Sequence, residues 1–286
     1  MTGAPDARAV ADALAGAGHP GVAVHVFDEL PSTNAWLAAR DPGADPGGAL
    51  CVAHSQVRGA GRRGRTWRSR PGDATFSLRR RFASPPERIA PLGLVTGVAV
   101  ARALRASTGL DIALKWPNDL LLGGSKLGGL LIESRSGAGG TARAGCVAVG
   151  GVGINLIAGE ARPGVATLGD HGVAPGARDR LVATVAAGVL EAWARFDEEG
   201  WMAFEGDWRA LDALEGRAVR VHAGAPRGDA PGLGGAFAGD GADDDPSARF
   251  DGVARGVDAG GALRVERADG RTVAVHAGEV SVRARP

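Results

Sequence analysis

Tyrosine is absent from this chain, and several other residue types are rare among its 286 residues: there are two cysteines, two lysines, three asparagines and one glutamine. Two cysteines cannot supply a framework of several disulfide bonds or a four-ligand zinc site, which excludes small disulfide-rich and zinc-finger proteins. No run of about 18 apolar residues occurs without interruption, and the N-terminus lacks a basic segment followed by an apolar one. We therefore expect a soluble, cytoplasmic protein.

The chain also lacks an excess of charge of either sign. The 33 Lys and Arg residues nearly balance the 32 Asp and Glu residues, so no global basic field exists that would hold nucleic acid or an anionic membrane. Hydrophobic residues make up 44% of the chain, an ordinary share for a globular protein. The length is sufficient for one large domain or two ordinary ones.

The rare amide and ammonium side chains are concentrated in a few motifs. The chain has replaced Lys by Arg almost everywhere, a bias that a GC-rich genome would produce. A Lys, Asn or Gln that remains despite this bias is there either by chance or because a site requires the geometry of its side chain. Because all six lie in the motifs described below, a requirement of the site is favoured over chance. They are Asn34, Gln56, Lys115, Asn118, Lys126 and Asn155.

Strand-like and helix-like segments alternate through the first two thirds of the chain. Ser32 can cap a short helix, and residues 89–104 and 178–196 space their apolar side chains as helices do. Interleaved strands and helices indicate an α+β or α/β fold. The apolar or alternating segments that predict strands are 22–27, 49–54, 74–79, 111–114, 119–122, 129–133 and 145–150.

After residue 208 the pattern changes to short alternating segments separated by turn signals, which indicates a small β-barrel. Between its first two strands, residues 224–247 are rich in Gly, Ala, Pro and Asp, and we expect a mobile loop there. The aspartates of this loop do not have EF-hand spacing, which favours solvated charge over a calcium site. The predicted strands are 217–222, 250–254, 262–267 and 272–276.

A glycine- and arginine-rich segment extends from Gln56 to Trp67. It matches G-x-G-x-x-G, but the arginines and Pro71 that follow do not open the apolar helix that a dinucleotide-binding turn requires. Nine arginines and a single acid, Asp73, lie between residues 58 and 81. We expect a flexible loop that brings guanidinium groups onto a phosphate-bearing small ligand.

Two alternatives stay open for this segment. Nucleic-acid binding would interleave several stacking aromatic residues with the arginines, whereas the stretch contains only Trp67 and Phe76. The other alternative is a solvated charged face that binds no ligand. Trp67 itself either stacks on a ligand or anchors the loop in the core.

Two further motifs carry polar residues beside predicted strands. Pro117 interrupts any helix in the motif K-W-P-N-D, so Asn118 and Asp119 stand at the start of a strand, where they either hold a hydrated cation or nucleotide or form a tight turn. Lys126 precedes two glycines that let a ligand approach the backbone. In the motif G-x-G-I-N, the glycines clear one face of a strand and Asn155 offers an amide that can read a base edge.

Together these residues resemble the biotin protein ligases over nearly the whole chain. The shared motifs are S-T-N at Ser32, Q-x-x-G-x-G-R-x-G-R-x-W at Gln56, K-W-P-N-D at Lys115, K-L-x-G-[IL]-L-x-E at Lys126, G-x-G-I-N at Gly151, and G-x-D-x-x-G-A-L with G-E-[VI]-S-[VL]-R within residues 256–283.

The resemblance implies an α+β fold with two domains. Residues 1–212 would form a catalytic domain similar to class II aminoacyl-tRNA synthetases, with a mixed sheet and flanking helices. Residues 213–286 would form an SH3-like barrel. It also implies the reaction: biotin and ATP give biotinyl-5′-AMP and pyrophosphate, and biotin is then transferred to a lysine of a biotin carboxyl carrier domain.

The resemblance assigns roles to individual residues. Arg62 and Lys126 would be the catalytic cations, and Mg²⁺ would accompany ATP near Asn118 and Asp119. The residues implied for biotin are Ser32, Thr33, Asn34, Gln56, Ala60, Gly61, Arg62, Lys126 and Gly129. The residues implied for ATP or the adenylate are Gly59, Arg62, Arg65, Trp67, Lys115, Asn118 and Asn155.

Two departures from the family affect these expectations. Members often carry Arg where this chain has Ala60, so we expect no side-chain contact from that position. Members that also repress transcription carry a helix-turn-helix domain before the S-T-N motif, and the 31 residues before Ser32 are too few for one, so we expect no DNA binding. We expect no membrane partner, and the resemblance allows a homodimer. Lipoate ligases, octanoyltransferases and a non-catalytic biotin or nucleotide sensor are the rival interpretations.

Overall fold

The computed structural model describes residues 3–136, 145–159, 162–223, 249–277 and 280–284. They divide into two compact units, Met1–Leu211 and Asp212–Pro286. The break lies beside the boundary expected after residue 212. Each unit is described by itself below.

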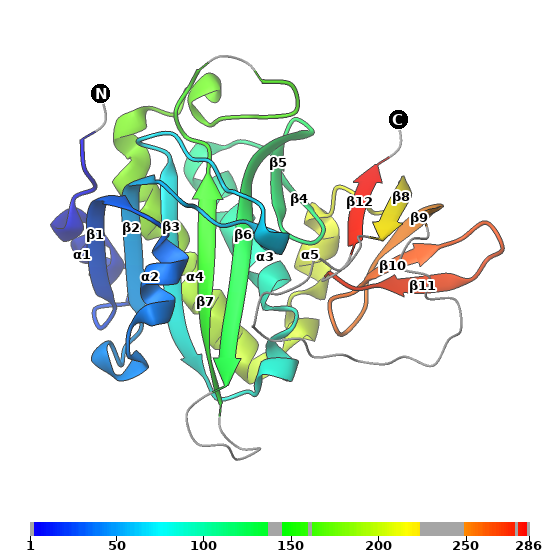
Figure 1. The fold of residues 1–286 in the computed structure, drawn as a ribbon, viewed down its shortest axis with the longest axis horizontal. Helices are drawn as coiled ribbons and strands as arrows, with labels where there is room; N and C mark the ends of the chain where they lie inside the picture. The colour runs from blue at the N-terminus through cyan, green and yellow to red at the C-terminus, as the bar shows by residue number, and fades with distance from the viewer. Residues whose placement is uncertain (1–2, 137–144, 160–161, 224–248, 278–279, 285–286) are drawn as a thin grey trace. The chain divides into compact units, whose positions relative to one another are not determined.

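The first unit contains a mixed seven-stranded sheet in the order β1-β2-β3-β7-β6-β5-β4 (Figure 1). The strands β1 and β2 are parallel, and every other neighbouring pair is antiparallel. Each strand overlaps one predicted from the sequence, and the mixed sheet expected for the catalytic domain is confirmed. The strands are β1 (Ala23–Leu30), β2 (Ala49–Gln56), β3 (Ala74–Phe82), β4 (Ile112–Lys115), β5 (Asp119–Leu122), β6 (Ser125–Ser136) and β7 (Cys146–Ile154).

Helices cover the two faces of this sheet unequally. The helices α3 and α4 pack against each other and cover one face, while α2 and the loop that follows β2 cross the other (Figure 1). Ser32 caps α2, because its hydroxyl accepts from the backbone N–H of Ala35. Gly109 ends α3 with a left-handed φ of 72°. The helices are α1 (Ala7–Gly16), α2 (Thr33–Ala39), α3 (Leu92–Thr108), α4 (Arg178–Glu199) and α5 (Glu205–Leu211).

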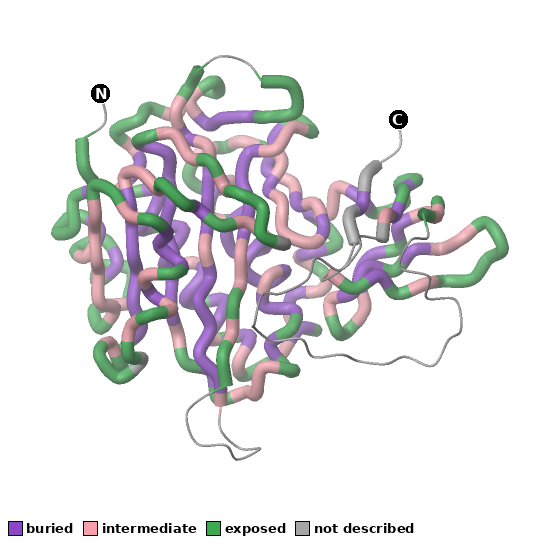
Figure 2. The backbone as a smooth tube through the Cα atoms, viewed as in Figure 1, coloured by how far each residue is buried: buried purple, intermediate pink, exposed green. Residues whose placement is uncertain are grey.

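The core lies between the sheet and the pair α3 and α4, where Figure 2 shows nearly continuous burial. Trp193 of α4 donates from Nε1 to the Thr96 hydroxyl of α3 at 2.9 Å. The same indole lies against β7, where a Cβ at Gly150 would stand 2.6 Å from the ring. One segment, Pro86–Thr108, is long and apolar enough to span a membrane by length and composition. Core packing accounts for its hydrophobicity, because most of α3 is buried.

The second unit is an antiparallel sheet in the order β11-β10-β9-β8-β12. Its apolar residues alternate into a small core that includes Val219, Val221, Leu263 and Val265. The sequence predicted four of these strands and missed β12. The described pairs include none between β11 and β12, so closure into an SH3-like barrel stays a prediction. The expected loop at 224–247 lies outside the described residues. The strands are β8 (Ala218–Ala223), β9 (Arg249–Val257), β10 (Leu263–Glu266), β11 (Thr272–Val275) and β12 (Val280–Ala284).

Candidate functional site

The glycine- and arginine-rich segment folds into a hairpin that crosses the face of the sheet opposite α3 and α4. A 3-10 turn, η2 (Arg62–Gly64), forms its tip. The segment is therefore held by its own backbone and does not open a helix. Its stem consists of a hydrogen bond from N–H of Trp67 to O of Gly59 (2.8 Å), a bond from N–H of Gly61 to O of Arg65 (2.7 Å), and an antiparallel bridge between Ala60 and Thr66.

Strand β7 has no side chains where this hairpin and α2 lie over it. Gly151 and Gly153 point to the same face, because alternate residues of a strand share a face. A Cβ at Gly151 would lie 2.5 Å from Oδ1 of Asn34, and a Cβ at Gly153 would lie 2.5 Å from the indole of Trp67. The glycines of the G-x-G-I-N motif thus make room for two predicted site residues.

Lys126 lies beside the Trp67 ring near the start of β6. Its ammonium nitrogen Nζ is 2.5 Å from Oδ1 of Asp119 and 5.8 Å from the centre of the Trp67 ring. Gly129 faces the same space, since a Cβ there would stand 3.3 Å from the ring and 3.6 Å from Nζ of Lys126. The indole N–H of Trp67 is buried and finds no hydrogen-bond partner within the described residues.

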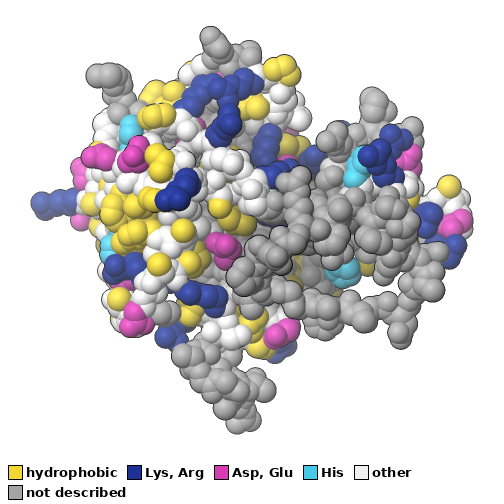
Figure 3. Space-filling view, in the orientation of Figure 1, with side chains coloured by type: hydrophobic (Ala, Val, Ile, Leu, Met, Phe, Trp, Pro, Cys, Tyr) yellow, Lys and Arg dark blue, Asp and Glu magenta, His cyan; other side chains and the backbone are white. Residues whose placement is uncertain are grey.

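Arg62, at the hairpin tip, reaches the segment between β4 and β5. Its Nη1 donates to Oδ1 of Asn118 over 3.5 Å. The Asn118 amide is oriented by its Nδ2, which donates to O of Leu130 at 2.8 Å. The predicted cations Arg62 and Lys126 therefore flank Asn118 and Asp119. On the face drawn in Figure 3, Lys and Arg side chains gather near the end of the sheet that carries these loops.

A second polar cluster lies next to the first on the same face of β7. The Gln56 side-chain oxygen accepts from the backbone N–H of Thr33 at 2.8 Å. The Thr33 and Ser77 hydroxyls are 2.7 Å apart, and the Ser77 hydroxyl donates to Oδ1 of Asn34 at 2.5 Å. Nδ2 of Asn34 then donates to Oε2 of Glu133 at 2.9 Å. The Thr33 hydroxyl has two acceptors for its single hydrogen, the Gln56 side-chain oxygen at 3.1 Å and the Ser77 hydroxyl at 2.7 Å.

Three residues that were predicted to contact the nucleotide, Arg65, Lys115 and Asn155, lie at the edge of these two clusters. Arg65 is exposed and donates from Nε to O of Arg62 at 3.5 Å. Lys115 pairs with Asp119 across the β4–β5 ladder, so both side chains share a face. Asn155 follows β7, and its amide nitrogen donates to two backbone oxygens, those of Lys126 (3.3 Å) and Ala166 (3.0 Å). That nitrogen is therefore already occupied.

Sequence reasoning missed three residues of the site: Ser77, Glu133 and Asp73. Ser77 belongs to a strand whose apolar pattern indicates only burial. Glu133 closes the motif that begins at Lys126, and that signal could have identified it. Asp73 did leave a signal as the one acid among nine arginines. It is buried, and its carboxylate accepts from the backbone N–H groups of Arg70, Leu156 and Ile157 at 2.7, 2.9 and 3.0 Å.

The predicted Mg²⁺ ligands do not form a metal site by themselves. Within the described ranges, no three His, Cys, Asp or Glu side chains group closely enough to hold a metal ion. Asp119 is paired with Lys126, and both ends of the Asn118 amide are hydrogen-bonded. A magnesium ion at this place would thus have to be held mainly by the phosphates of ATP, as is common for this ion.

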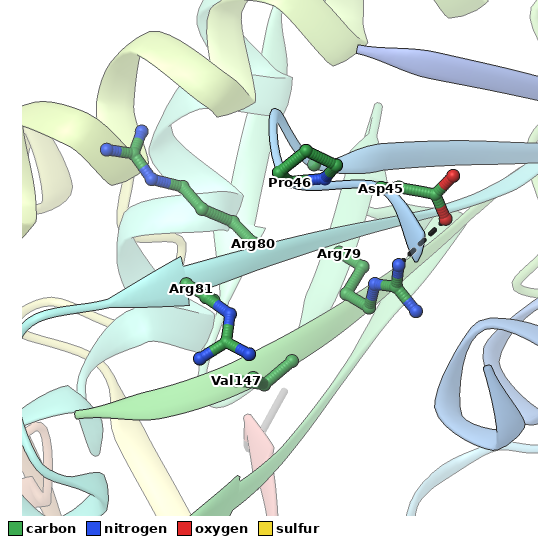
Figure 4. A pocket seen from close by; sticks show the side chains of 7 residues that line it. Asp45, Pro46, Arg79, Arg80, Arg81 and Val147 are labelled. Atoms are coloured by element: carbon green, nitrogen blue, oxygen red, sulfur yellow. Dashed lines mark hydrogen bonds and ion pairs between the residues drawn. The ribbon is translucent and has the colours of Figure 1, made fainter. Parts of the chain in front are cut away.

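A small cavity of about 10 Å³ lies between the segment that precedes β2 and the strands β3 and β7, where Asp45, Arg79 and Val147 line it (Figure 4). Within it, Arg79 points toward Asp45, with 2.8 Å between Nη2 and Oδ2, and both side chains are almost fully buried. Nη1 of Arg79 also donates to the backbone oxygens of Leu37 and Arg40 at the end of α2, each at 3.3 Å. Burial lowers the pKa of the Arg79 guanidinium, and Asp45 opposes that shift. This buried cation fixes the helix that carries Thr33 and Asn34.

Family models match both parts of the chain. Residues 26–151 match the biotin/lipoate A/B protein ligase family, and residues 245–283 match the biotin protein ligase C-terminal domain. A structure of biotin protein ligase from Aquifex aeolicus in complex with biotin and ATP has a TM-score of 0.65 over 93% of this chain and 99% of that one. At 22% identity, this likeness shows the fold.

Curated relatives agree over almost the full length. The biotin–[acetyl-CoA-carboxylase] ligases of Paracoccus denitrificans and Mycobacterium tuberculosis are each 32% identical, over 85% and 96% of this chain and 93% and 94% of theirs. The bifunctional ligase/repressor BirA of Escherichia coli is 30% identical over 92% of this chain and 75% of its own length. The resemblance seen in the motifs is confirmed, and this chain belongs to the biotin protein ligase family.

Proposed function

We propose that this protein activates biotin with ATP to biotinyl-5′-AMP and pyrophosphate, and then transfers biotin to a lysine of the carrier domain of acetyl-CoA carboxylase. Membership of the family and the names of the Paracoccus and Mycobacterium relatives support this reaction and this acceptor. One observation carries the proposal: Trp67 lies over Gly153 of β7 with Lys126 beside its ring, Arg62 bonds to Asn118, and the polar cluster of Thr33, Asn34 and Gln56 lies over Gly151 of the same strand.

In the first step, a carboxylate oxygen of biotin attacks the α-phosphorus of ATP, and the bond from that phosphorus to the pyrophosphate oxygen breaks. A simple carboxylic acid is ionised at neutral pH, so no general base is needed. The step instead needs cations that compensate charge on the phosphoryl oxygens and on departing pyrophosphate. Lys126 supplies one from the sheet, and Arg62 supplies the other from the hairpin.

The two clusters suit a ligand with a polar ring at one end and a carboxylate at the other. Asn34 lies over Gly151 and Trp67 lies over Gly153, two residues further along the strand, about 7 Å away. We assign the ureido ring of biotin to the cluster of Thr33, Asn34 and Gln56. Its carboxylate then extends along β7 toward Lys126.

Adenine is assigned to the indole of Trp67. The ring offers a flat apolar surface, and its buried N–H, which has no partner in the described part of the chain, faces β7 at Gly153. The amide nitrogen of Asn155 is bound to backbone oxygens, so a contact with the base edge would use its side-chain oxygen as an acceptor. An exocyclic amino group, such as that of adenine, would satisfy that oxygen.

In the second step, the neutral amine of the carrier lysine attacks the acyl carbon of the adenylate. The amide bond forms, AMP leaves with the bonding electrons, and the amine proton passes to solvent. The hairpin over the adenylate would exclude water and other amines until the carrier docks. We also propose that β8–β12 close into an SH3-like barrel, which five short antiparallel strands and the match to the biotin ligase C-terminal model support.

The proposal is tested by exchange of radiolabelled pyrophosphate into ATP. With Mg²⁺ and the purified full chain, we expect exchange that depends on biotin and is absent with lipoate or octanoate. A carrier domain added afterwards should gain one biotin. Exchange with lipoate alone would favour a lipoate ligase, while binding of biotin without any exchange would favour a sensor; either result would overturn the proposed activity.

A further inference from the structure

The carboxylate of Asp73 joins two loops that border the proposed adenylate site. One oxygen accepts from the backbone N–H of Arg70, at the end of the segment that carries Trp67 (2.7 Å). The other accepts from N–H of Leu156 and Ile157, immediately after Asn155 (2.9 and 3.0 Å). Arg70 reinforces the junction, because its Nη1 donates to O of Ile157 at 3.1 Å.

The segment of residues 155–157, which Asp73 binds, is also hydrogen-bonded to the backbone of Lys126 and Leu127. Asn155 directly precedes the two N–H groups bound by Asp73. Its own N–H donates to O of Leu127 at 2.9 Å, and its Nδ2 donates to O of Lys126. An unbroken series of hydrogen bonds and one peptide link thus connects Asp73 to the residue assigned to the α-phosphate.

Burial makes this junction hard to replace. Asp73 is only 4% exposed, so its three backbone N–H partners depend on the carboxylate and not on bulk water. Three backbone N–H groups around an ionised carboxylate form charge-assisted bonds, which are about twice as strong as neutral ones. Loss of the carboxylate would release both loops together.

We infer that Asp73 is a positioning residue for adenylate formation, and that it acts by holding the backbone of residues 155–157 and through it Lys126. This inference rests on the proposed function. Within the described residues, the polar cluster assigned to biotin makes no hydrogen bond with Asp73; its members bond to one another and to Ser77. Removing the carboxylate should therefore slow the chemistry of the first step while leaving the binding of biotin alone unchanged.

The chain offers a matched control at the other end of the same strand. Asp197 accepts from the backbone N–H groups of Ala83 and Ser84 at 2.9 and 3.2 Å, just after β3 ends. It performs the same backbone capping far from Lys126 along the strand. Asp73→Ala and Asp197→Ala should both lower the melting temperature. Asp197→Ala therefore controls for the loss of backbone capping as such.

The experiment compares wild type, Asp73→Ala, Asp73→Asn and Asp197→Ala in the full chain, below every melting temperature. Calorimetry gives the affinity for biotin alone, and a single turnover with ATP and Mg²⁺ gives the rate of adenylate formation. For Asp73→Ala we expect a rate about 10- to 100-fold lower with an unchanged biotin affinity, since misplacement by about 1 Å has effects of that size. Asp73→Asn, which keeps an oxygen for Leu156 and Ile157, should recover part of the rate.

Three outcomes decide the matter. If Asp73→Ala and Asp197→Ala form adenylate at the wild-type rate, Asp73 only stabilises the fold and the inference is wrong. If Asp73→Ala does not fold, Asp73→Asn decides by the same two measurements: a slower rate with unchanged biotin affinity supports the inference, and a wild-type rate overturns it. If wild type itself forms no adenylate, it is the proposed function that fails, because the inference is judged only relative to a wild-type rate.

Discussion

The ammonium of Lys126 and the carboxylate of Asp119 face each other at 2.5 Å on neighbouring strands, and both remain partly exposed. The proposed catalytic cation is thus paired with an anion of this chain. The biotin carboxylate and the α-phosphate must compete with Asp119 for that ammonium. The pair keeps Lys126 extended over Gly129, where the ligand would arrive.

Replacing Lys126 by Ala should lower biotin-dependent pyrophosphate exchange by about 10²- to 10³-fold, the cost of losing one group that stabilises transition-state charge. The measurement is the exchange rate at saturating biotin and ATP. Arg195→Ala serves as the control, since that exposed arginine on α4 contacts Glu199 and the ring of Phe204 and belongs to neither proposed cluster. Normal exchange in Lys126→Ala would remove this lysine from the mechanism.

Replacing Arg62 by Ala should speed the loss of biotinyl-AMP from the enzyme and increase the labelling of bystander lysines, because the hairpin tip would lose its cation over the adenylate. A stopped-flow chase with unlabelled biotin measures the release rate. The matched variant Arg68→Ala removes an exposed arginine just beyond the stem and should release the intermediate at the wild-type rate. Equal release rates in both variants would contradict the role of Arg62.

Gly153→Ala should raise the KM for ATP and lower the melting temperature, since the new methyl group would stand 2.5 Å from the indole of Trp67 and would displace it. Steady-state exchange kinetics and a thermal melt measure the two effects. Gly206→Ala is the control: it lies in α5 with open space around it, and the substitution should stabilise the protein by about 0.5–1 kcal/mol. An unchanged KM in Gly153→Ala would argue that Trp67 does not contact the nucleotide.

Asp45→Asn should destabilise the fold by about 3–5 kcal/mol, because it leaves the buried guanidinium of Arg79 without its charge partner. Urea unfolding followed by circular dichroism gives the free energy of unfolding. The exposed pair on α4 supplies the comparison, with a loss of about 0.3–0.5 kcal/mol expected for Glu199→Gln. A loss in Asp45→Asn as small as that of the control would mean that the buried pair contributes little.

Both thiols should resist alkylation in the folded protein. Burial raises the pKa of Cys51 to about 12 and that of Cys146 to about 11, so almost no thiolate exists at pH 8. Iodoacetamide at pH 8 should label neither in the native state and both in urea, as counted by mass spectrometry. Because these pKa values are higher in the folded state, the thiols also reduce stability as the pH rises from about 9 through 12. Rapid native labelling at pH 8 would contradict this burial.

Local patterns predicted the elements well, and tertiary contacts explain what was missed. The helical spacing at 178–196 and the alternation at 22–27 depend on which side chains are buried, and that information is local. The network from Thr33 through Ser77 to Glu133 joins two strands and a helix, so its members become neighbours only after folding. Likewise, the single acid at 73 was visible in the sequence, but two of its three partners lie 83 and 84 residues away.

A single sequence predicts some properties of the site residues and not others. The motifs predicted that Arg62, Asn118 and Lys126 belong together, and the structure brings them together. The motifs did not indicate that the side-chain nitrogen of Asn155 would donate to the backbone oxygens of Lys126 and Ala166. A residue type suggests which bonds are available, whereas only the fold determines which of them are used internally.

The stem of the Gly59–Trp67 hairpin is a short ladder, and this limits what can move when a ligand is enclosed. Its backbone bonds already fix both ends, so covering an adenylate would require a change of conformation in the three residues of the tip alone. Ordering three residues costs roughly 3–6 kcal/mol of conformational entropy, far less than ordering the twelve from Gln56 to Trp67. The enzyme can thus enclose a reactive anhydride and reopen for a carrier protein without first rebuilding the loop.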